Sequence, residues 1–446
     1  MDSQSKKSLF QTIILTVFGL AALFAIGLFA ANKGTSTKKT DELTGTLSIW
    51  GTIPSATITT SLENLSRDYP DLQLVYSEQS PETMETQLVE AMANGAGPDI
   101  FMITPEMIMR NRQRLLAIPY TSFSDSTFKQ TFADQANLFL LPEGVVGFPV
   151  FINPLVMYVN NDLLTQNYIV QAPTTWEQLT DMVSQVTRFT ETGTIIQTLG
   201  ALGTYDNITH VKPLIATLLF QAGDPITQIL PGSRIISATV NESGESVFNF
   251  YTGFSNPQSE FYSWNTGQIN DQDMFISGNS AVYFGLANEV QGIREKNPNL
   301  NFSVHMVTNT GSFNKNTVYG ELTGWGINKM SKNVGLSVQV LQIMSKSEFV
   351  TSVLNNSFLA PARRDMLIKL PVDDALRTTI YKSAIISRGF WDPNNDTTSK
   401  ILQKGLNAVI TGETTPVSAY STWIGEMSNM LTTMQESLQV NSNENQ

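Results

Sequence analysis

Short apolar segments that alternate with helical segments are the feature that most limits how this chain can fold. Residues 46–50 (TLSIW), 72–76 (LQLVY) and 99–103 (DIFMI) have the length and composition of strands. Between them, apolar residues recur at helical spacing in residues 58–69 and 84–92. Strands that alternate with helices predict an α/β fold around a largely parallel sheet.

The same alternation continues through the rest of the chain. Further strands are predicted at residues 145–150, 155–159, 274–276, 281–284, 302–307 and 324–327. Further helices are predicted at residues 334–344, 379–386, 401–411 and 420–438. Thr174 and Glu177 have the spacing of a capping box at the start of another helix. Residues 392–396 resemble the start of a calcium loop but lack its glycine and final glutamate, so we expect a solvent-exposed turn there.

An uncharged apolar run lies near the N-terminus. As a helix, residues 9–31 would span about 34 Å at ~1.5 Å per residue, which exceeds the ~30 Å of a bilayer core. Two lysines precede the run and favour a cytoplasmic N-terminus. We therefore predict a cytoplasmic segment at residues 1–8, a transmembrane anchor at 9–31 and a tether at 32–45. The alternative is a cleaved signal peptide, for which residues 25–27 (AIG) offer a weak site. Both interpretations place the remaining residues outside the cytoplasm.

The composition excludes several classes of function. The chain has 446 residues and a formal net charge of −12, and residues 1–40 hold five lysines against one aspartate, so the remainder is more acidic still. This acidity argues against nucleic-acid binding, which needs Lys and Arg to neutralise phosphates. The chain has no cysteine, and His210 and His305 are its two histidines. Phosphate-loop, zinc-protease and nucleophile-elbow motifs are absent, so we expect no catalytic residue, no metal site and no cofactor.

A series of strings along the chain carries a more specific signal. The strings are residues 91–103 (AMANGAGPDIFMI), 147–164 (GFPVFINPLVMYVNNDLL), 172–179 (APTTWEQL), 274–284 (MFISGNSAVYF), 321–331 (ELTGWGINKMS), 358–364 (FLAPARR) and 409–419 (VITGETTPVSA). In this order they resemble the bacterial extracellular solute-binding proteins of ABC importers, of the maltose/oligosaccharide-binding type. Two features depart from that pattern. Val159 stands where the family usually has a tyrosine before Asn160, and the lipid-carrying cysteine of many members is missing.

The resemblance implies a two-lobed, periplasmic-binding-protein-like fold of type II. Its two α/β lobes are discontinuous in sequence and close over a small ligand by a hinge motion. We expect lobe 1 in residues 46–152 plus 326–370 and lobe 2 in residues 153–325 plus 371–438. The tail at residues 439–446 is polar, and we expect it to be loose.

The function that the resemblance implies is that of a receptor without enzymatic activity. It would be held at the cell membrane by a single span, bind a small solute outside the cell, and deliver it to the permease subunits of an ABC importer. We expect an oligosaccharide ligand, because tryptophans interleaved with Asn, Gln and Glu suit a sugar. We also expect the protein to be a monomer. Glu78, Glu106, Glu289 and Glu321 would suit a polyamine or another cation instead, if all of them faced the cleft. A sensor that works through a membrane partner and an exported hydrolase of the same ancestry are further alternatives.

Candidate ligand-binding residues are those that follow the predicted strands, because ligands of open α/β sheets bind beyond the carboxyl ends of strands. Trp50, Trp325 and Trp391 could stack their rings on the apolar faces of a sugar. The polar candidates are Gln79, Thr104, Glu106, Asn153, Asn207, Asn288 and Glu321. Neighbouring positions that could contribute are Glu78, Asp206, Glu289, Arg388 and Phe390.

Overall fold

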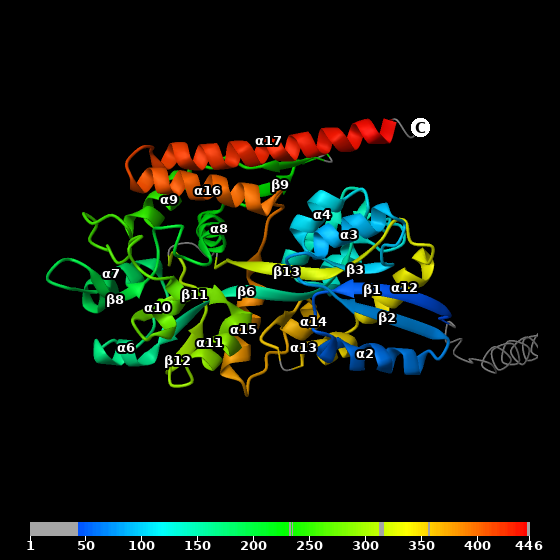
Figure 1. The fold of residues 1–446 in the computed structure, drawn as a ribbon, viewed down its shortest axis with the longest axis horizontal. Coiled ribbons are helices and arrows are strands. Elements are labelled where there is room, and N and C mark those ends of the chain that lie inside the picture. The colour runs from blue at the N-terminus through cyan, green and yellow to red at the C-terminus, as the bar shows by residue number, and fades with distance from the viewer. Residues whose placement is uncertain (1–42, 232, 234, 312–315, 356, 444–446) are drawn as a thin grey trace, which may run out of the picture.

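The computed structural model describes residues 43–231, 233, 235–311, 316–355 and 357–443, and its centre is one large mixed sheet (Figure 1). The strands of the sheet follow one another in the order β2 (Leu72–Glu78), β1 (Gly45–Gly51), β3 (Ile100–Ile103), β13 (Val318–Ile327), β6 (Phe148–Asn160), β11 (Ser280–Leu286), β8 (Ile195–Gly200) and β7 (Arg188–Phe189). Three more strands pair beside this path: β12 (Phe302–His305) and β14 (Ala360–Pro361) with β6, and β15 (Ser387–Arg388) with β13. Two small antiparallel pairs complete the strands, β4 (Leu140–Leu141) with β5 (Gly144–Val145), and β9 (Thr227–Ile229) with β10 (Ile236–Ala238).

Helices lie on both sides of this sheet (Figure 1). In chain order they are α2 (Ser55–Asp68), α3 (Met84–Ala93), α4 (Pro105–Asn111), α5 (Asp125–Thr131), η1 (Asp134–Phe139), α6 (Asn161–Gln166), α7 (Trp176–Val186), α8 (Val211–Ala222), α9 (Ser243–Gly253), α10 (Asp271–Ile276), η2 (Ala287–Glu289), α11 (Val290–Lys296), α12 (Val334–Met344), α13 (Ser347–Leu354), α14 (Arg364–Leu367), α15 (Ala375–Ile385), α16 (Asn395–Ile410) and α17 (Pro416–Asn443), where η marks a 3-10 helix.

The N-terminal part of the sheet has the predicted βαβ pattern. β1 pairs in parallel with both β2 and β3, and α2 and α3 connect these strands. Ile58, Leu62 and Leu65, the apolar stripe of α2, are buried. The helix forms because this stripe, spaced at helical intervals, can be removed from water against the sheet. We call β1–β3 and the helices around them lobe 1.

The other end of the sheet forms lobe 2, which comprises β7, β8 and β11 with the helices around them. β8 and β11 are parallel, whereas β6 runs antiparallel to β11. The sheet is therefore parallel within parts of each lobe and antiparallel in the middle, and the expectation of a largely parallel sheet was wrong for the strands that join the lobes.

Two long strands, β6 and β13, pass between the lobes and pair antiparallel with each other. β13 also pairs with β3 of lobe 1, and β6 with β11 of lobe 2. The expected lobe boundaries after residues 152 and 325 fall inside these two strands. The two crossing strands therefore join the lobes and run through the middle of the molecule (Figure 1).

Three local predictions differ from the structure. Residues 145–150 and 155–159 were expected to be separate strands, but β6 continues through the proline between them. Residues 274–276 were expected to form a strand but belong to helix α10. A run of three apolar residues is too short to distinguish the period of a strand from that of a helix. The cap of α7 is Thr175, whose hydroxyl accepts a hydrogen bond from the backbone N–H of Gln178, one residue later than the predicted pair.

The ends of the chain bear on the predicted anchor and tail. Residues 9–31 lie outside the described residues. Within the described part of the chain, no helix has the length and apolar character needed to cross a bilayer. At the other end, α17 extends to Asn443, past the expected start of the tail at residue 439. This helix packs along α16, and Figure 1 shows it above the crossing strands.

Candidate ligand-binding cavity

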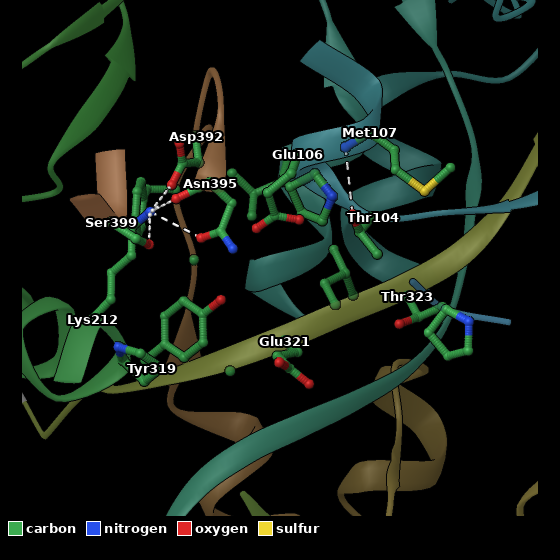
Figure 2. A pocket seen from close by; sticks show the side chains of 18 of the residues that line it. Thr104, Glu106, Met107, Lys212, Tyr319, Glu321, Thr323, Asp392, Asn395 and Ser399 are labelled. Carbon is green, nitrogen blue, oxygen red and sulfur yellow. Dashed lines mark hydrogen bonds and ion pairs between the residues drawn. The ribbon is translucent and has the colours of Figure 1, made fainter. Parts of the chain in front are cut away.

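A cavity of about 500 Å³ lies between the two lobes, within the range of ~300–1,000 Å³ that is usual for small-molecule sites. Its walls are α4 of lobe 1 and the first turn of α8 in lobe 2, β13 contributes the floor, and residues 389–399 close one side. Figure 2 shows side chains from these four elements converging on one space. The site therefore depends on segments that are far apart in the sequence.

The wall on lobe 1 begins where β3 ends. Thr104 follows this strand and caps α4, since its hydroxyl accepts a hydrogen bond from the backbone N–H of Met107 at 3.4 Å. Glu106 lies in the first turn of the helix and lines the cavity. One turn later, the Arg110 guanidinium donates from Nε to Glu85 Oε1 at 2.7 Å, so both charges of that pair are satisfied within lobe 1.

The wall on lobe 2 is organised around Lys212, whose residue is only 8% exposed. Its ammonium forms an ion pair with Asp392, which is 1% exposed. Lys212 Nζ also donates to Asn395 Oδ1 at 2.9 Å and to the hydroxyl of Thr398 at 2.5 Å. The solvent-exposed turn expected at residues 392–396 is therefore wrong for Asp392, because the buried ammonium from α8 holds this carboxylate inside.

The floor of the cavity is polar because of the alternation along β13. Tyr319, Glu321 and Thr323 are spaced two residues apart, which places them on one face of the strand, and all three line the cavity. Figure 2 shows these three side chains along the strand at the cavity. The carboxylate of Glu321 accepts a hydrogen bond from Asn153 Nδ2 at 3.0 Å.

Aromatic rings supply the apolar surface of the site. Tyr319 and Phe390 lie with their ring centroids 6.4 Å apart, and both line the cavity together with Tyr205. The ammonium of Lys212 lies 6.0 Å from the centroid of the Phe390 ring. Rings next to carboxylates, hydroxyls and amides suit a ligand with both apolar faces and hydroxyl groups.

The cavity disfavours negative charge on two of its carboxyl groups. Burial raises the pKa of Glu106 above its ordinary value, and Asp392 contributes in the same direction. Burial also raises the pKa of Glu321, and the negative charge of Glu106 adds to this shift. Burial raises the pKa of Tyr319 well above its ordinary value, so its hydroxyl stays protonated and can donate a hydrogen bond.

Three of the predicted site residues line this cavity, namely Thr104, Glu106 and Glu321, and so does the neighbouring candidate Phe390. Asn153 lies beside Glu321 on the neighbouring strand β6. It is 3% exposed, pairs with Glu321 across the two crossing strands, and accepts a hydrogen bond at Oδ1 from the backbone N–H of Asn288 at 3.1 Å. Asn153 therefore orients a cavity residue and does not line the cavity itself.

The three predicted tryptophans are not part of the cavity wall. Trp325 is 1% exposed and packs in the core beneath Gly51, because it lies on the buried stretch of β13. Trp391 is 8% exposed, and its indole N–H donates to the backbone oxygen of Leu138 at 3.0 Å. Trp50 is half-buried against the core. The aromatic surface of the cavity comes from tyrosine and phenylalanine.

The remaining polar candidates have structural partners outside the cavity. Asn207 donates to the backbone oxygens of Asn265 and Gln268, each at 3.0 Å, which fixes the loop before α8. Gln79 donates to the hydroxyl of Ser77 at 2.7 Å beyond the end of β2. Asn288 is exposed at η2, where its backbone meets Asn153.

Of the four glutamates that would have suited a cation, two line the cavity, Glu106 and Glu321. Glu78 is exposed and accepts a hydrogen bond from the backbone N–H of Ser55 at 2.8 Å. Glu289 forms an ion pair with His210. The structure therefore does not gather all four carboxylates around one ligand. Among the described residues, no group of three or more His, Asp or Glu is arranged to hold a metal ion.

Sequence reasoning missed several cavity residues, of which Lys212, Tyr319 and Asp392 are the most prominent. The alternation Tyr-x-Glu-x-Thr before the buried part of β13 could have revealed Tyr319. Nothing local marks Lys212, because it lies in a helix whose other faces are buried and its partner is 180 residues away.

Comparison with known proteins agrees with this geometry. The model of the family described as "Bacterial extracellular solute-binding protein" matches residues 62–374. A comparison with curated protein sequences gave no match. Among solved structures, a cyclo/maltodextrin-binding protein complexed with maltotetraose superposes with a TM-score of 0.68 at 15% identity, over 88% of this chain and 97% of that one.

Two further structures show the same fold. The sugar-binding protein MalE from Xanthomonas citri has a TM-score of 0.68 at 14% identity, covering 89% of this chain and 99% of its own. The ABC substrate-binding protein Lmo0181 from Listeria monocytogenes, in complex with cycloalternan, has a TM-score of 0.64 at 14% identity, covering 88% and 99%. At these identities the likeness establishes a periplasmic-binding-protein-like fold. The expectation of a binding protein rather than an enzyme agrees with the family, and we conclude that this chain belongs to the bacterial extracellular solute-binding proteins.

Proposed function

We propose that the chain is a membrane-tethered extracellular receptor that binds a carbohydrate between its lobes and delivers it to an ABC importer. The observation that carries this proposal is the cavity itself. Its rings, Tyr205, Tyr319 and Phe390, stand beside hydrogen-bonding side chains that include Glu321 and Thr323. Aromatic faces with polar groups around them suit a sugar, whose rings have apolar faces and hydroxyl edges.

The structural neighbours support the same ligand class. The solved structures with this fold include proteins in complex with maltotetraose and with cycloalternan. Fold likeness at such low identity does not transfer a ligand, so the cavity of this chain must support the assignment on its own residues.

The ligand is tested by a thermal-shift screen of the full chain in detergent against neutral oligosaccharides, polyamines and short peptides. A ligand that binds only the folded state raises the unfolding temperature. At a hundredfold excess over its Kd, such a ligand raises the free energy of unfolding by about 2.7 kcal/mol. A shift with oligosaccharides supports the proposal. A shift with polyamines or peptides and with no sugar contradicts it.

The tether is tested by cell fractionation. If residues 9–31 form an anchor, the protein stays in the membrane fraction after washing with alkaline carbonate, and mass spectrometry finds the intact N-terminus. A shortened protein in the soluble extracellular fraction would instead support the signal-peptide interpretation.

Delivery to an importer is tested by uptake of the radiolabelled sugar that the screen identifies. Cells without the receptor should lose uptake, and a variant that binds the sugar but lacks the anchor should restore it only in part, because tethering raises the local concentration near the permease. Unchanged uptake in cells without the receptor would contradict a role in delivery.

A further inference from the structure

The charged side chains that line the cavity are not balanced. Four carboxylates and two cations line it, and each cation already has a carboxylate partner. Arg110 is paired with Glu85 in lobe 1, and Lys212 with Asp392 in lobe 2. Arg110 donates two hydrogen bonds to the Glu85 carboxylate. Lys212 donates further hydrogen bonds to the side-chain oxygens of Asn395 and Thr398.

The two carboxylates left over are Glu106 and Glu321. Neither has an ion-pair partner among the described residues. They come from different elements, α4 and β13, and both line the same cavity (Figure 2). Glu321 has one fixed hydrogen bond, from Asn153, and its other oxygen remains free to accept.

Two carboxylates in a partly enclosed site repel each other and lose hydration, which is unfavourable unless a positive charge joins them. A neutral sugar would donate hydrogen bonds to them but would leave the negative charge in place. An ammonium group would supply both the donors and the compensating charge.

The rest of the lining limits how much positive charge the ligand can carry. Glu85 and Asp392 are already paired with Arg110 and Lys212, so the lining offers two uncompensated carboxylates, and a long polycation that filled the whole space would carry more positive charge than they can balance. Uncharged groups such as Thr323, Asn395 and Ser399 instead offer partners for hydroxyls. The lining is therefore suited to a mostly uncharged, hydroxyl-rich molecule with a positive charge at one place.

We propose that the physiological ligand is an amine-bearing carbohydrate, with its ammonium group held between Glu106 and Glu321 and its rings against Tyr319 and Phe390. This inference rests on the proposed carbohydrate function and narrows it to sugars with a free amino group. Glu106 and Glu321 are the residues that set the preference for an amino sugar over a neutral sugar. They belong to two elements, α4 and β13, that meet only in the folded protein.

The test compares three matched series by isothermal titration of the full chain in detergent: glucosamine oligomers of two to four units, their N-acetylated counterparts, and neutral cello-oligosaccharides. We expect the glucosamine oligomers to bind at least tenfold more tightly than both other series at pH 7 and low salt. The preference should shrink as salt is added, because it is electrostatic.

Variants locate the preference. Glu106→Gln and Glu321→Gln should each reduce the preference for the glucosamine oligomers by about tenfold, because the amide keeps a hydrogen-bonding group but removes the negative charge. Glu90→Gln is the matched control, since Glu90 is exposed on α3 outside the cavity and its removal changes the net charge equally. A loss of preference in Glu90→Gln as well would show a general charge effect and contradict the inference.

The remaining outcomes separate this inference from the proposed function. Equal or tighter binding of the neutral or N-acetylated series would overturn the inference and leave the carbohydrate function standing. Binding of none of the three sugar series would overturn both, whether or not spermidine binds.

Discussion

Asn153 on β6 and Glu321 on β13 face each other where the two crossing strands pair, and Asn153 Nδ2 donates a hydrogen bond to the Glu321 carboxylate at 3.0 Å. The same amide accepts from the backbone N–H of Asn288, so one buried side chain connects both crossing strands to lobe 2. The cavity carboxylate is thus oriented by its neighbour on the paired strand, a residue that the ligand does not need to touch.

Replacing Asn153 with alanine should affect both stability and binding. The change removes a buried amide and leaves the Asn288 N–H without its acceptor, which typically costs about 1–3 kcal/mol. Sugar affinity should fall several-fold because Glu321 is no longer held. Urea unfolding and ligand titration measure the two effects. Asn64→Ala on the exposed face of α2 serves as control, with an expected change within about 0.5 kcal/mol. Equal effects of the two substitutions would show that Asn153 does not position Glu321.

The buried pair between Lys212 and Asp392 should be strongly coupled. Lys212→Met leaves a carboxylate that is 1% exposed without its counter-charge, and breaking such a pair costs about 3–5 kcal/mol. The double variant Lys212→Met with Asp392→Asn should recover part of that loss, because no buried charge remains. Chemical unfolding of the four proteins of this cycle gives the coupling. Additive losses would mean that the two groups do not depend on each other.

The cavity carboxylates should make stability depend on pH in a definite direction. Burial raises the pKa of Glu106 and of Glu321 above the ordinary value of 4.5, so the folded protein holds these protons more tightly than the unfolded chain. Their contribution is most favourable below pH 4.5 and is lost as the pH rises through the folded-state pKa values. Other charged groups act on these two as well, among them Lys212, His210 and Glu289.

The matching experiment uses Glu106→Gln and Glu321→Gln without ligand. At pH 7 Glu106→Gln should raise the unfolding temperature slightly, by about 1–3 °C, and Glu321→Gln should raise it less, because Glu321 is exposed and solvent screens its charge. Each substitution should flatten the loss of stability as the pH rises from 4.5 to 7. Differential scanning calorimetry across that range measures both. A lower unfolding temperature at pH 7 would mean that the two carboxylates stabilise the unliganded protein.

Phe390 and its neighbour Trp391 should behave differently when replaced. Phe390→Leu keeps an apolar side chain but removes the ring from the cavity wall, which should weaken sugar binding by about 0.5–1.5 kcal/mol, or roughly 2–12-fold. Trp391→Phe should leave affinity unchanged and reduce stability by about 1–3 kcal/mol, because the buried backbone oxygen of Leu138 loses its donor. Ligand titration and chemical unfolding of both variants measure the two effects. If Trp391→Phe weakened binding and Phe390→Leu did not, Trp391 and not Phe390 would contact the ligand.

The sequence predicted the elements of lobe 1 well. The strand at 46–50 became β1, and the apolar stripe of 58–69 became the buried face of α2, because period-two and helical patterns each match one way of hiding apolar side chains. Polar residues just after strands were a useful guide where the strand leads into the cavity, as at Thr104 and Glu106. The same rule did not separate them from Gln79, since sequence position does not tell which strand end faces the other lobe.

The sequence alone determined most of the succession of strands and helices and the family, because both are carried by local patterns of residues. It also determined the acidic charge, which is a sum over the composition. Only the tertiary structure decided which side chains share the cavity. Glu106, Lys212, Glu321 and Asp392 are brought together by β13 and by helices of two lobes, and tryptophans that looked suited to a sugar were placed elsewhere. The physical reason is that burial and charge pairing depend on long-range packing: the ammonium of Lys212 satisfies Asp392 only because α8 and the segment before α16 meet in the folded protein.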